Sequence, residues 1–287
     1  MVEIKRATLD LFDVIYPLIE HFPFSHMDRK RWLRFLEHNF SKRHEYFGYV
    51  LTEGKRAVGF LGGLFHERQM GGTVHSFCNL FCWYVLEGYR SQSLMLLLPF
   101  LKEHDLTVTS LTPSREACKI LRQFQFQVLE RDIIVLPVLP ARGASPGFDI
   151  SSDPKRITDI LDQKDLKILH DHGPAWCGHL AVWERKEKKN YCYVVFNKVK
   201  KRGLPFTQVY YTGEPEIFRK NLGRIQREFL RVNRTFFTVI DRRLFHGPVS
   251  FPCFSYRLRY PRLYRSHTLK SEQIDNLYSE LLFFQQI

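Results

Sequence analysis

One stretch of the chain, from Cys78 to Leu98, joins an apolar segment to a turn rich in hydroxyl groups. Its first part is almost entirely apolar or aromatic, which is typical of a buried strand. Ser91 and Ser93 then stand where they can cap a helix that continues toward Lys102. A strand that turns into a helix through small residues points free backbone N–H groups, and the positive end of the helix dipole, at one place. That arrangement suits a phosphate group, and the same residues also fit a corner that only packs.

Three side chains on this predicted strand, or just before it, could take part in chemistry. His75 can exchange a proton near neutral pH, although a lone histidine at the entrance of a strand also fits a structural role. Asn79 can orient a water molecule but cannot accept a proton. Cys82 could act as a nucleophile, whereas a thiol inside a strand is typical of inert packing.

The six cysteines form no Cys-x-x-Cys pair, and no histidine pair completes a zinc site near Cys78 and Cys82. We therefore expect buried free thiols and no bound metal. No apolar run is long enough to cross a membrane, and the first ten residues lack the apolar core of a signal peptide, so the expected compartment is the cytoplasm.

Positive charge is concentrated in the second half of the chain. Residues 1–150 carry 18 Lys and Arg against 16 Asp and Glu, whereas residues 151–287 carry 25 against 14. A basic half indicates an anionic partner or a solvated basic face. One feature of this half is a basic helix, which carries Arg219, Lys220, Arg224, Arg227 and Arg231. Another is a segment in which tyrosines alternate with arginines, as in surfaces that stack nucleic acid bases or sugars. Its residues are Tyr256, Arg257, Arg259, Tyr260, Arg262, Tyr264 and Arg265.

Residues 1–138 alternate strand and helix patterns in the order β-α-α-β-β-β-α-β-α-β. Two of the strands, at 46–51 and 57–64, form a hairpin, and 106–111 reads as a short buried strand. Thr112 is the predicted N-cap of the following helix, with Pro113 in its first turn. The fold class that follows is mixed α/β.

Residues 140–152, rich in Pro, Gly and Ser, predict a linker. Beyond it we expect a helix at 153–170, a hairpin at 190–211, a basic helix at 215–231, strands at 235–241 and 255–259, and a closing helix at 271–284. Hairpin, long helix and strand repeat the order of residues 46–111, which indicates a second, degenerate copy of the first fold. The predicted domains are 1–139 and 153–287.

The order of elements and the residues of the central corner resemble the GNAT superfamily of acyltransferases, which use acyl-coenzyme A. Val85 takes the strand-end position of the first family signature, and Arg90 takes the place of its Arg or Gln. In the family the amides of this loop bind the coenzyme pyrophosphate. The resemblance therefore assigns binding of acetyl-CoA, or of another acyl-CoA, to the following residues: Tyr84, Val85, Arg90, Ser91, Gln92, Ser93, Leu94 and Met95.

The resemblance extends to a second signature, whose positions are occupied by Ala117, Leu121 and Gln125-Phe126. In the family a backbone N–H of the central strand, here near Tyr84 and Val85, stabilises the oxyanion. Asn79 stands where some relatives carry a glutamate, so the catalytic candidates are His75 and Asn79.

The chain also departs from the family pattern. Ser93 and Met95 replace glycines that let the backbone approach phosphate. Leu121 replaces a tyrosine that protonates the departing thiolate in many relatives.

Three functions follow as hypotheses. The first is an acyl-CoA-dependent N- or O-acyltransferase with two GNAT-like halves, the coenzyme in the first half, and an amine or hydroxyl acceptor that could be anionic. The second is a catalytically degenerate binding or regulatory module. The third is a tandem GNAT-like transferase that takes aminoacyl groups from tRNA, because the basic half would suit a nucleic acid.

Overall fold

The computed structural model describes residues 1–22, 27–37, 40–41, 43–138, 147–173, 175–201, 203–248 and 253–284. The chain forms two compact units. Unit 1 consists of Met1–Leu129, Tyr260–Lys270 and Tyr278–Glu280, and unit 2 consists of Glu130–Arg259, Ser271–Leu277 and Leu281–Ile287. Each unit thus takes part of its structure from the end of the chain.

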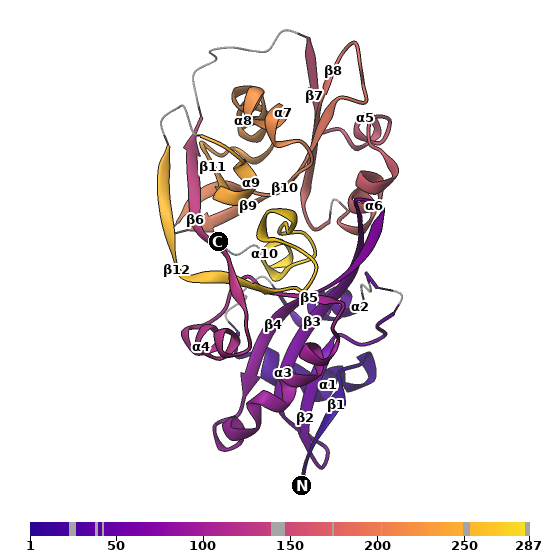
Figure 1. Cartoon of the computed structure of the whole chain (residues 1–287), viewed down its shortest axis with the longest axis vertical. Helices are drawn as coiled ribbons and strands as arrows, with labels where there is room; N and C mark the ends of the chain where they lie inside the picture. Colours follow the sequence, from indigo (N-terminus) through magenta and orange to yellow (C-terminus); the bar gives the residue numbers. More distant parts are fainter. Residues whose placement is uncertain are drawn as a thin grey trace. The chain divides into compact units, whose positions relative to one another are not determined.

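Unit 1 is built on a mixed sheet in which β1 to β4 pair antiparallel in chain order, β4 pairs parallel with β5, and β5 pairs antiparallel with the end of β12 (Figure 1). The strands are β1 (Val2–Arg6), β2 (Gly48–Glu53), β3 (Arg56–Met70), β4 (Thr73–Val85), β5 (Leu106–Ser110) and β12 (Phe254–Arg265). β6 (Gln127–Pro137) begins in unit 1 and continues in unit 2. β4 is therefore the central strand, antiparallel to one neighbour and parallel to the other.

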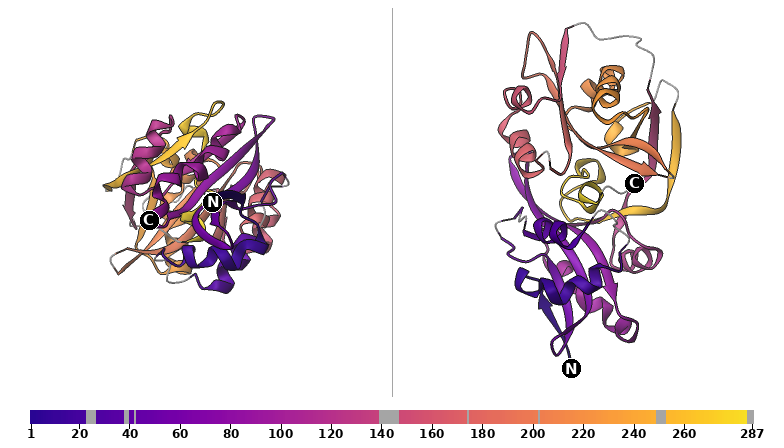
Figure 2. Two further views of the ribbon diagram at one scale, coloured as in Figure 1. Left: turned by 90° about the horizontal axis from the view of Figure 1, so that it is seen from below. Right: turned by 180° about the vertical axis from the view of Figure 1, so that it is seen from behind.

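Helices cover both faces of this sheet. They are η1 (Leu9–Leu11), α1 (Phe12–Ile19), α2 (Arg29–Glu37), η2 (Glu87–Gln92), α3 (Ser93–Lys102) and α4 (Arg115–Gln123). Leu97 and Phe100 of α3 and Leu121 of α4 share one apolar cluster with β2 to β5. On the other face Trp32 and Phe35 of α2 pack against Phe81 of β4. Figure 1 shows α3 in front of the sheet, and the view from behind in Figure 2 shows α1 and α2 in front.

Unit 2 repeats this succession of pairings. β7 to β10 pair antiparallel in order, β10 pairs parallel with β11, and β11 pairs antiparallel with β6. The strands are β7 (Phe148–Ser151), β8 (Gly178–Glu184), β9 (Tyr191–Lys201), β10 (Leu204–Thr212) and β11 (Phe237–Asp241). The helices are α5 (Pro154–Thr158), α6 (Gln163–Asp171), α7 (Pro215–Lys220), α8 (Leu222–Asn233), α9 (Arg242–Phe245), η3 (Ser271–Gln273) and α10 (Glu280–Phe283), the last of which begins in unit 1.

The mixed α/β fold predicted from the sequence is confirmed, as are its strands and helices up to residue 137. In the second half the predicted helix at 153–170 is two helices, and the basic helix at 215–231 is α7 followed by α8. Strands β7 and β8 were not predicted. Much of the predicted linker, at 140–146, lies outside the described residues.

Two local predictions near the end of β5 and the end of the chain are wrong. Ser114, not Thr112, caps α4, because its hydroxyl accepts from the N–H of Ala117. The closing helix predicted at 271–284 is reduced to η3 and α10. Tyr278 has φ of 51°, a left-handed conformation that ends any helical run before Glu280.

Candidate active site

The central strand of unit 1 has an open edge. Its parallel pairing with β5 ends at the pair Asn79 and Thr109, whereas β4 continues to Val85 with β3 as its neighbour. Backbone N–H and C=O groups on such an edge can receive an extended ligand as an additional strand. The edge thus lies between the predicted catalytic residues and the predicted coenzyme-binding turn.

A β-bulge interrupts β4 within this edge. Phe60 pairs with Tyr84 and Gly62 pairs with Phe81, so that Cys82 and Trp83 face a single residue of β3. Cys82 has φ of 49°, in the left-handed region. A bulge re-aims backbone groups away from the regular ladder, and bulges are frequent beside active sites.

The predicted coenzyme-binding residues follow directly. Tyr84 stacks on His21 with ring centroids 4.5 Å apart, and Val85 ends β4. The turn is a 3-10 helix, η2, that runs into α3, and the N-cap of α3 is Gln92, so neither Ser91 nor Ser93 caps the start of a helix as predicted. The N–H of Ser93 donates to the carbonyl of Arg90. Arg90, Ser91, Leu94 and Met95 are exposed and Gln92 is half-buried, which leaves the Met95 side chain at the surface.

Two polar atoms at this corner are buried without a hydrogen-bond partner among the described residues. They are the indole Nε1 of Trp83, a donor on the bulge, and the amide Oε1 of Gln92, an acceptor before α3. Buried polar groups in native proteins normally have a partner, so such atoms indicate a site for water or ligand. A ligand arm that contains amide groups, such as that of a coenzyme, requires both a donor and an acceptor, so Trp83 and Gln92 fit such an arm.

The predicted catalytic residue Asn79 is buried, and both ends of its amide are used. Its Nδ2 donates to Thr109 Oγ1 over 2.9 Å, and its Oδ1 accepts from the N–H of Glu280 over 3.2 Å. Asn79 therefore holds the start of α10 next to the point where β4 and β5 stop pairing. It orients a part of the chain that sequence reasoning did not connect with this site.

Glu280 places a buried carboxylate at the end of β5. Its Oε1 accepts from the N–H of Leu111 (3.2 Å) and from the N–H and hydroxyl of Thr112 (both 2.9 Å). Its Oε2 is buried and has no hydrogen-bond partner among the described residues. One oxygen is thus fixed by three donors, while the other is buried and accepts no hydrogen bond from a described residue.

Burial dominates the electrostatics of this carboxylate. Desolvation raises the pKa of Glu280 to about 7, against the lowering effects of Thr112, Leu111 and the positive charge of Arg262. A carboxyl group with a pKa near the working pH can accept and release a proton in catalysis. The sequence signal was weak: a lone glutamate among apolar residues of a predicted closing helix.

The other two candidates have different surroundings. Cys82 is buried, and burial together with the negative charge of Glu280 raises its thiol pKa well above the usual value, which disfavours a thiolate. His75 is half-buried near the start of β4, opposite Arg68 of β3. Because β4 extends from His75 past Asn79 to the bulge, His75 lies well before the open edge, and its catalytic role stays a prediction.

The basic residues of unit 2 are largely engaged within the chain. Arg219 donates to the carbonyl of Phe245, Arg224 to that of Phe148, and Arg231 pairs with Glu228. In the tyrosine–arginine segment, Arg262 and Tyr264 are buried in unit 1, so the predicted alternating surface is restricted to the first part of β12.

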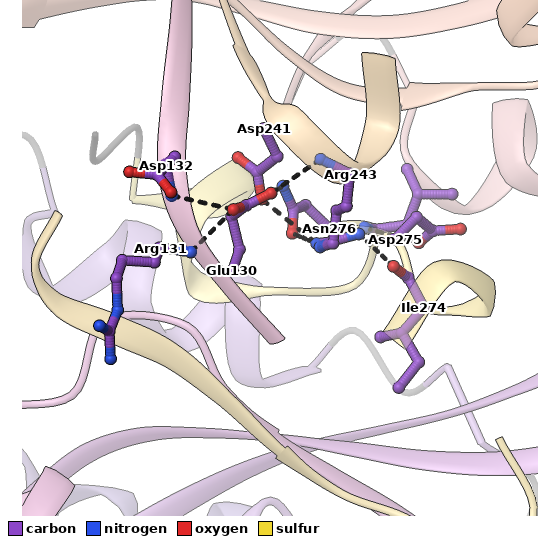
Figure 3. Close-up of polar contacts among 9 residues, drawn as sticks. Glu130, Arg131, Asp132, Asp241, Arg243, Ile274, Asp275 and Asn276 are labelled. Carbon is purple, nitrogen blue, oxygen red and sulfur yellow. Dashed lines mark hydrogen bonds and ion pairs between the residues drawn. The ribbon is translucent and has the colours of Figure 1, made fainter. Parts of the chain in front are cut away.

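Unit 2 contains a buried polar network at the end of β11 (Figure 3). Asp241 Oδ2 accepts from Arg243 over 3.3 Å and from the Asn276 amide over 3.0 Å, and Glu130 accepts from the N–H of Arg243 over 2.8 Å. The N–H of Asn276 donates to the carbonyl of Tyr210, where β10 has its own bulge against β9. The chain's own C-terminal segment therefore contacts the position in unit 2 that corresponds to the bulge of β4.

Among the described residues, no group of His, Cys, Asp and Glu side chains could hold a metal ion. Within the same part of the chain, no helix has the length and apolar character needed to span a membrane.

The sequence itself matches no protein-family model and no curated protein. Solved structures of the same fold are GCN5-related N-acetyltransferases from Anabaena variabilis (TM-score 0.59, 11% identity, 92% of this chain and 72% of that one) and Kribbella flavida (0.58, 12%, 93% and 71%). The structure of Eis1 from Mycobacterium abscessus is similar as well, with a TM-score of 0.53 and 12% identity over 93% of this chain and 73% of Eis1. The chain has the GNAT fold that its central corner resembles.

Proposed function

We propose that the protein is an acyl-CoA-dependent N- or O-acyltransferase whose reaction centre lies in unit 1, between the bulge of β4 and Glu280. The observation that carries the proposal is the Glu280 carboxylate, with one oxygen fixed and the other unpartnered, beside the open edge of β4. The GNAT fold and the acetyltransferases that share it support acyl transfer as the reaction class.

The donor, acetyl-CoA or another acyl-CoA, would lie along the β4 edge and the turn into α3. Trp83 Nε1 and Gln92 Oε1 supply an unpartnered donor and acceptor for its amide groups. The turn from Arg90 to Met95 lies at the start of α3, where the helix dipole favours a pyrophosphate. Thioester chemistry is supplied by the donor, and the chain binds and orients it.

Glu280 would act as the general base. As the acceptor nitrogen or oxygen forms its bond to the thioester carbonyl carbon and the carbon–sulfur bond breaks, the acceptor proton moves to Glu280 Oε2 and the coenzyme leaves as its thiolate. A backbone N–H near the bulge would stabilise the oxyanion. Asn79 positions Glu280 by accepting a hydrogen bond from the Glu280 N–H, and the Thr112 hydroxyl holds Glu280 Oε1 in place.

The predicted two GNAT-like halves, 1–139 and 153–287, belong to this proposal. Unit 2 repeats the strand pairings of unit 1. In unit 2, however, Asn276 already donates to the Tyr210 carbonyl at the corresponding bulge. We therefore assign the coenzyme to unit 1 alone and regard the second half as degenerate.

The test is the melting temperature of the full chain with acetyl-CoA and with longer acyl-CoA thioesters, followed by release of the CoA thiol with a panel of amines. A ligand that binds the folded state at 100 times its Kd stabilises it by about 2.7 kcal/mol, a shift that is easily measured. Glu280→Gln should keep the shift and lose turnover. No shift with any thioester at millimolar concentration would rule out the proposal.

The same experiment separates the alternatives. A degenerate binding module, which Leu121 and Met95 favour, would show the thermal shift without thiol release from the wild-type chain. A tRNA-dependent transferase would show a salt-sensitive mobility shift with tRNA and no response to acyl-CoA.

A further inference from the structure

A pocket of about 140 Å³ opens in unit 1 between α2 and the middle of β3. Its walls are apolar side chains from α2, from the segment before β2 and from β3: Phe35, Leu36, Phe40, Phe47, Leu64 and Phe65. All of them except Phe40 are buried. None of these residues was a candidate in the sequence analysis.

One wall of the pocket lies on the strand next to the proposed reaction centre. Leu64 is the direct cross-strand partner of Asn79, the residue that holds Glu280, and directly opposed side chains lie about 5 Å apart on one face of a sheet. Phe40 contacts the ring of Tyr278 edge-on, with centroids 5.2 Å apart. Tyr278 precedes Glu280 by two residues. Two lining residues of the pocket therefore neighbour residues that lie close to Glu280, and neither Asn79 nor Glu280 lines the pocket itself.

The size and lining of the pocket determine what it can hold. An apolar cavity of about 150 Å³ stays dry and binds benzene, so this volume suits one aromatic ring or a short branched alkyl group. Two exposed carboxylates, Glu37 and Glu45, also line the pocket and make no ion pair with a described residue. Their charge attracts a cationic ligand and repels an anionic one.

We propose that this pocket binds a primary amine with an aromatic or branched alkyl group, which fills the pocket while the ammonium group lies beside Glu37 and Glu45. The transfer of an acyl group to it rests on the proposed function, whereas binding of the amine to the pocket does not. The carboxylates at the mouth select against acceptors with an acidic tail. This assignment differs from the anionic acceptor considered from the overall charge of +13.

The test measures binding by calorimetry in the absence of acyl-CoA, with three probes: 2-phenylethylamine, 3-phenylpropionate and ethylamine. We expect 2-phenylethylamine to bind about tenfold or more tightly than either of the others, because ethylamine lacks the group that fills the pocket and 3-phenylpropionate carries the wrong charge. Equal affinities, or tighter binding of the carboxylate, would overturn the inference.

Two variants locate the binding site. Leu64→Phe fills the pocket and should weaken 2-phenylethylamine binding about tenfold, whereas Leu98→Phe, the same change at an exposed position of α3, should leave it unaltered. Because Leu64→Phe adds volume to a buried site, a double variant, Glu37→Gln with Glu45→Gln, gives a readout that does not disturb the core. It should reduce the preference for the amine over 3-phenylpropionate several-fold, and an unchanged preference would contradict the role of the carboxylates.

The outcome separates this inference from the proposed function. If 2-phenylethylamine binds as expected and no acyl-CoA shifts the melting temperature, the pocket assignment stands and the acyltransferase proposal fails. If acyl-CoA binds and is turned over with small or acidic acceptors while 2-phenylethylamine does not bind, the inference about the pocket alone is wrong.

Discussion

The backbone N–H of Glu280 donates a hydrogen bond of 3.2 Å to the side-chain oxygen of Asn79, which joins two residues 201 positions apart in the sequence. Asn79 lies on the central strand where parallel pairing with β5 ends. The bond therefore brings a carboxylate from the last residues of the chain to the centre of unit 1. Both residues are almost fully buried, so a polar link at this place is costly to remove.

The first prediction concerns the pH dependence of turnover. Because Glu280 must be ionised to accept a proton and its pKa is raised to about 7, kcat/KM of the wild-type chain should rise with pH and level off above that value. Glu280→Gln should lose this limb, and its kcat should fall by about 10² or more. Initial rates of thiol release between pH 5.5 and 9 measure both effects. A variant that retains the wild-type limb would show that another group is the base.

The same carboxyl group should make stability depend on pH. Its pKa is about 7 in the folded chain against an ordinary value of 4.5, so the folded state binds an additional proton between these values. Stability must then fall as the pH rises through this window, by about 3 kcal/mol for this group. Between pH 4.5 and pH 7.5, the free energy of unfolding measured with urea should fall by about 3 kcal/mol less in Glu280→Gln than in the wild type. The control Glu187→Gln, at an exposed position, should behave as the wild type.

Thr112 and Ser114 offer a matched pair of hydroxyl groups. The Thr112 hydroxyl stabilises the ionised form of Glu280, so Thr112→Val should raise the pKa of Glu280 and move the rising limb of kcat/KM toward higher pH. Ser114→Ala removes the cap of α4 and should cost about 1 kcal/mol of stability. It should leave the pH profile in place. A shift of the limb in Ser114→Ala as large as in Thr112→Val would show a general disturbance of the fold.

Periodicity and turn residues were sufficient to predict the elements of residues 1–137, because those strands and helices carry regular apolar patterns. They failed for the closing segment. Ile274, Leu277 and Leu281 are spaced as a helical stripe, and all three are buried. Only Leu281 lies in a helix, α10, whereas coil buries Ile274 and Leu277 equally well. Tertiary packing determines that conformation, and local propensity does not report it.

Only the part of the site that is local in sequence was predicted. The open edge of β4 and the turn into α3 are local in sequence, so Val85 and Arg90 could be placed from their neighbours alone. Glu280 depends on contacts with Asn79 and Thr112, both far away in the chain, and a single sequence carries no sign of such contacts.

The last prediction concerns the buried network of unit 2. Arg243 pairs with Asp241 and also donates to Asn276 and to the carbonyl of Ile274, so it links α9 to the C-terminal segment (Figure 3). Arg243→Met should cost about 3–5 kcal/mol, because it breaks a buried ion pair by removing the guanidinium that contacts Asp241. Arg231→Met breaks the exposed pair with Glu228 and should change stability little, because water screens an exposed ion pair.

Hydrogen exchange distinguishes a local effect from a global one in the Arg243 variant. The N–H of Asn276 is bonded to the Tyr210 carbonyl, and its protection should fall most if Arg243 holds the segment there. Amides in the middle of β9, which this network does not touch, should retain their relative protection. Equal losses of protection in β9 and at Asn276 would show that Arg243 supports unit 2 as a whole and does not specifically fasten the C-terminal segment.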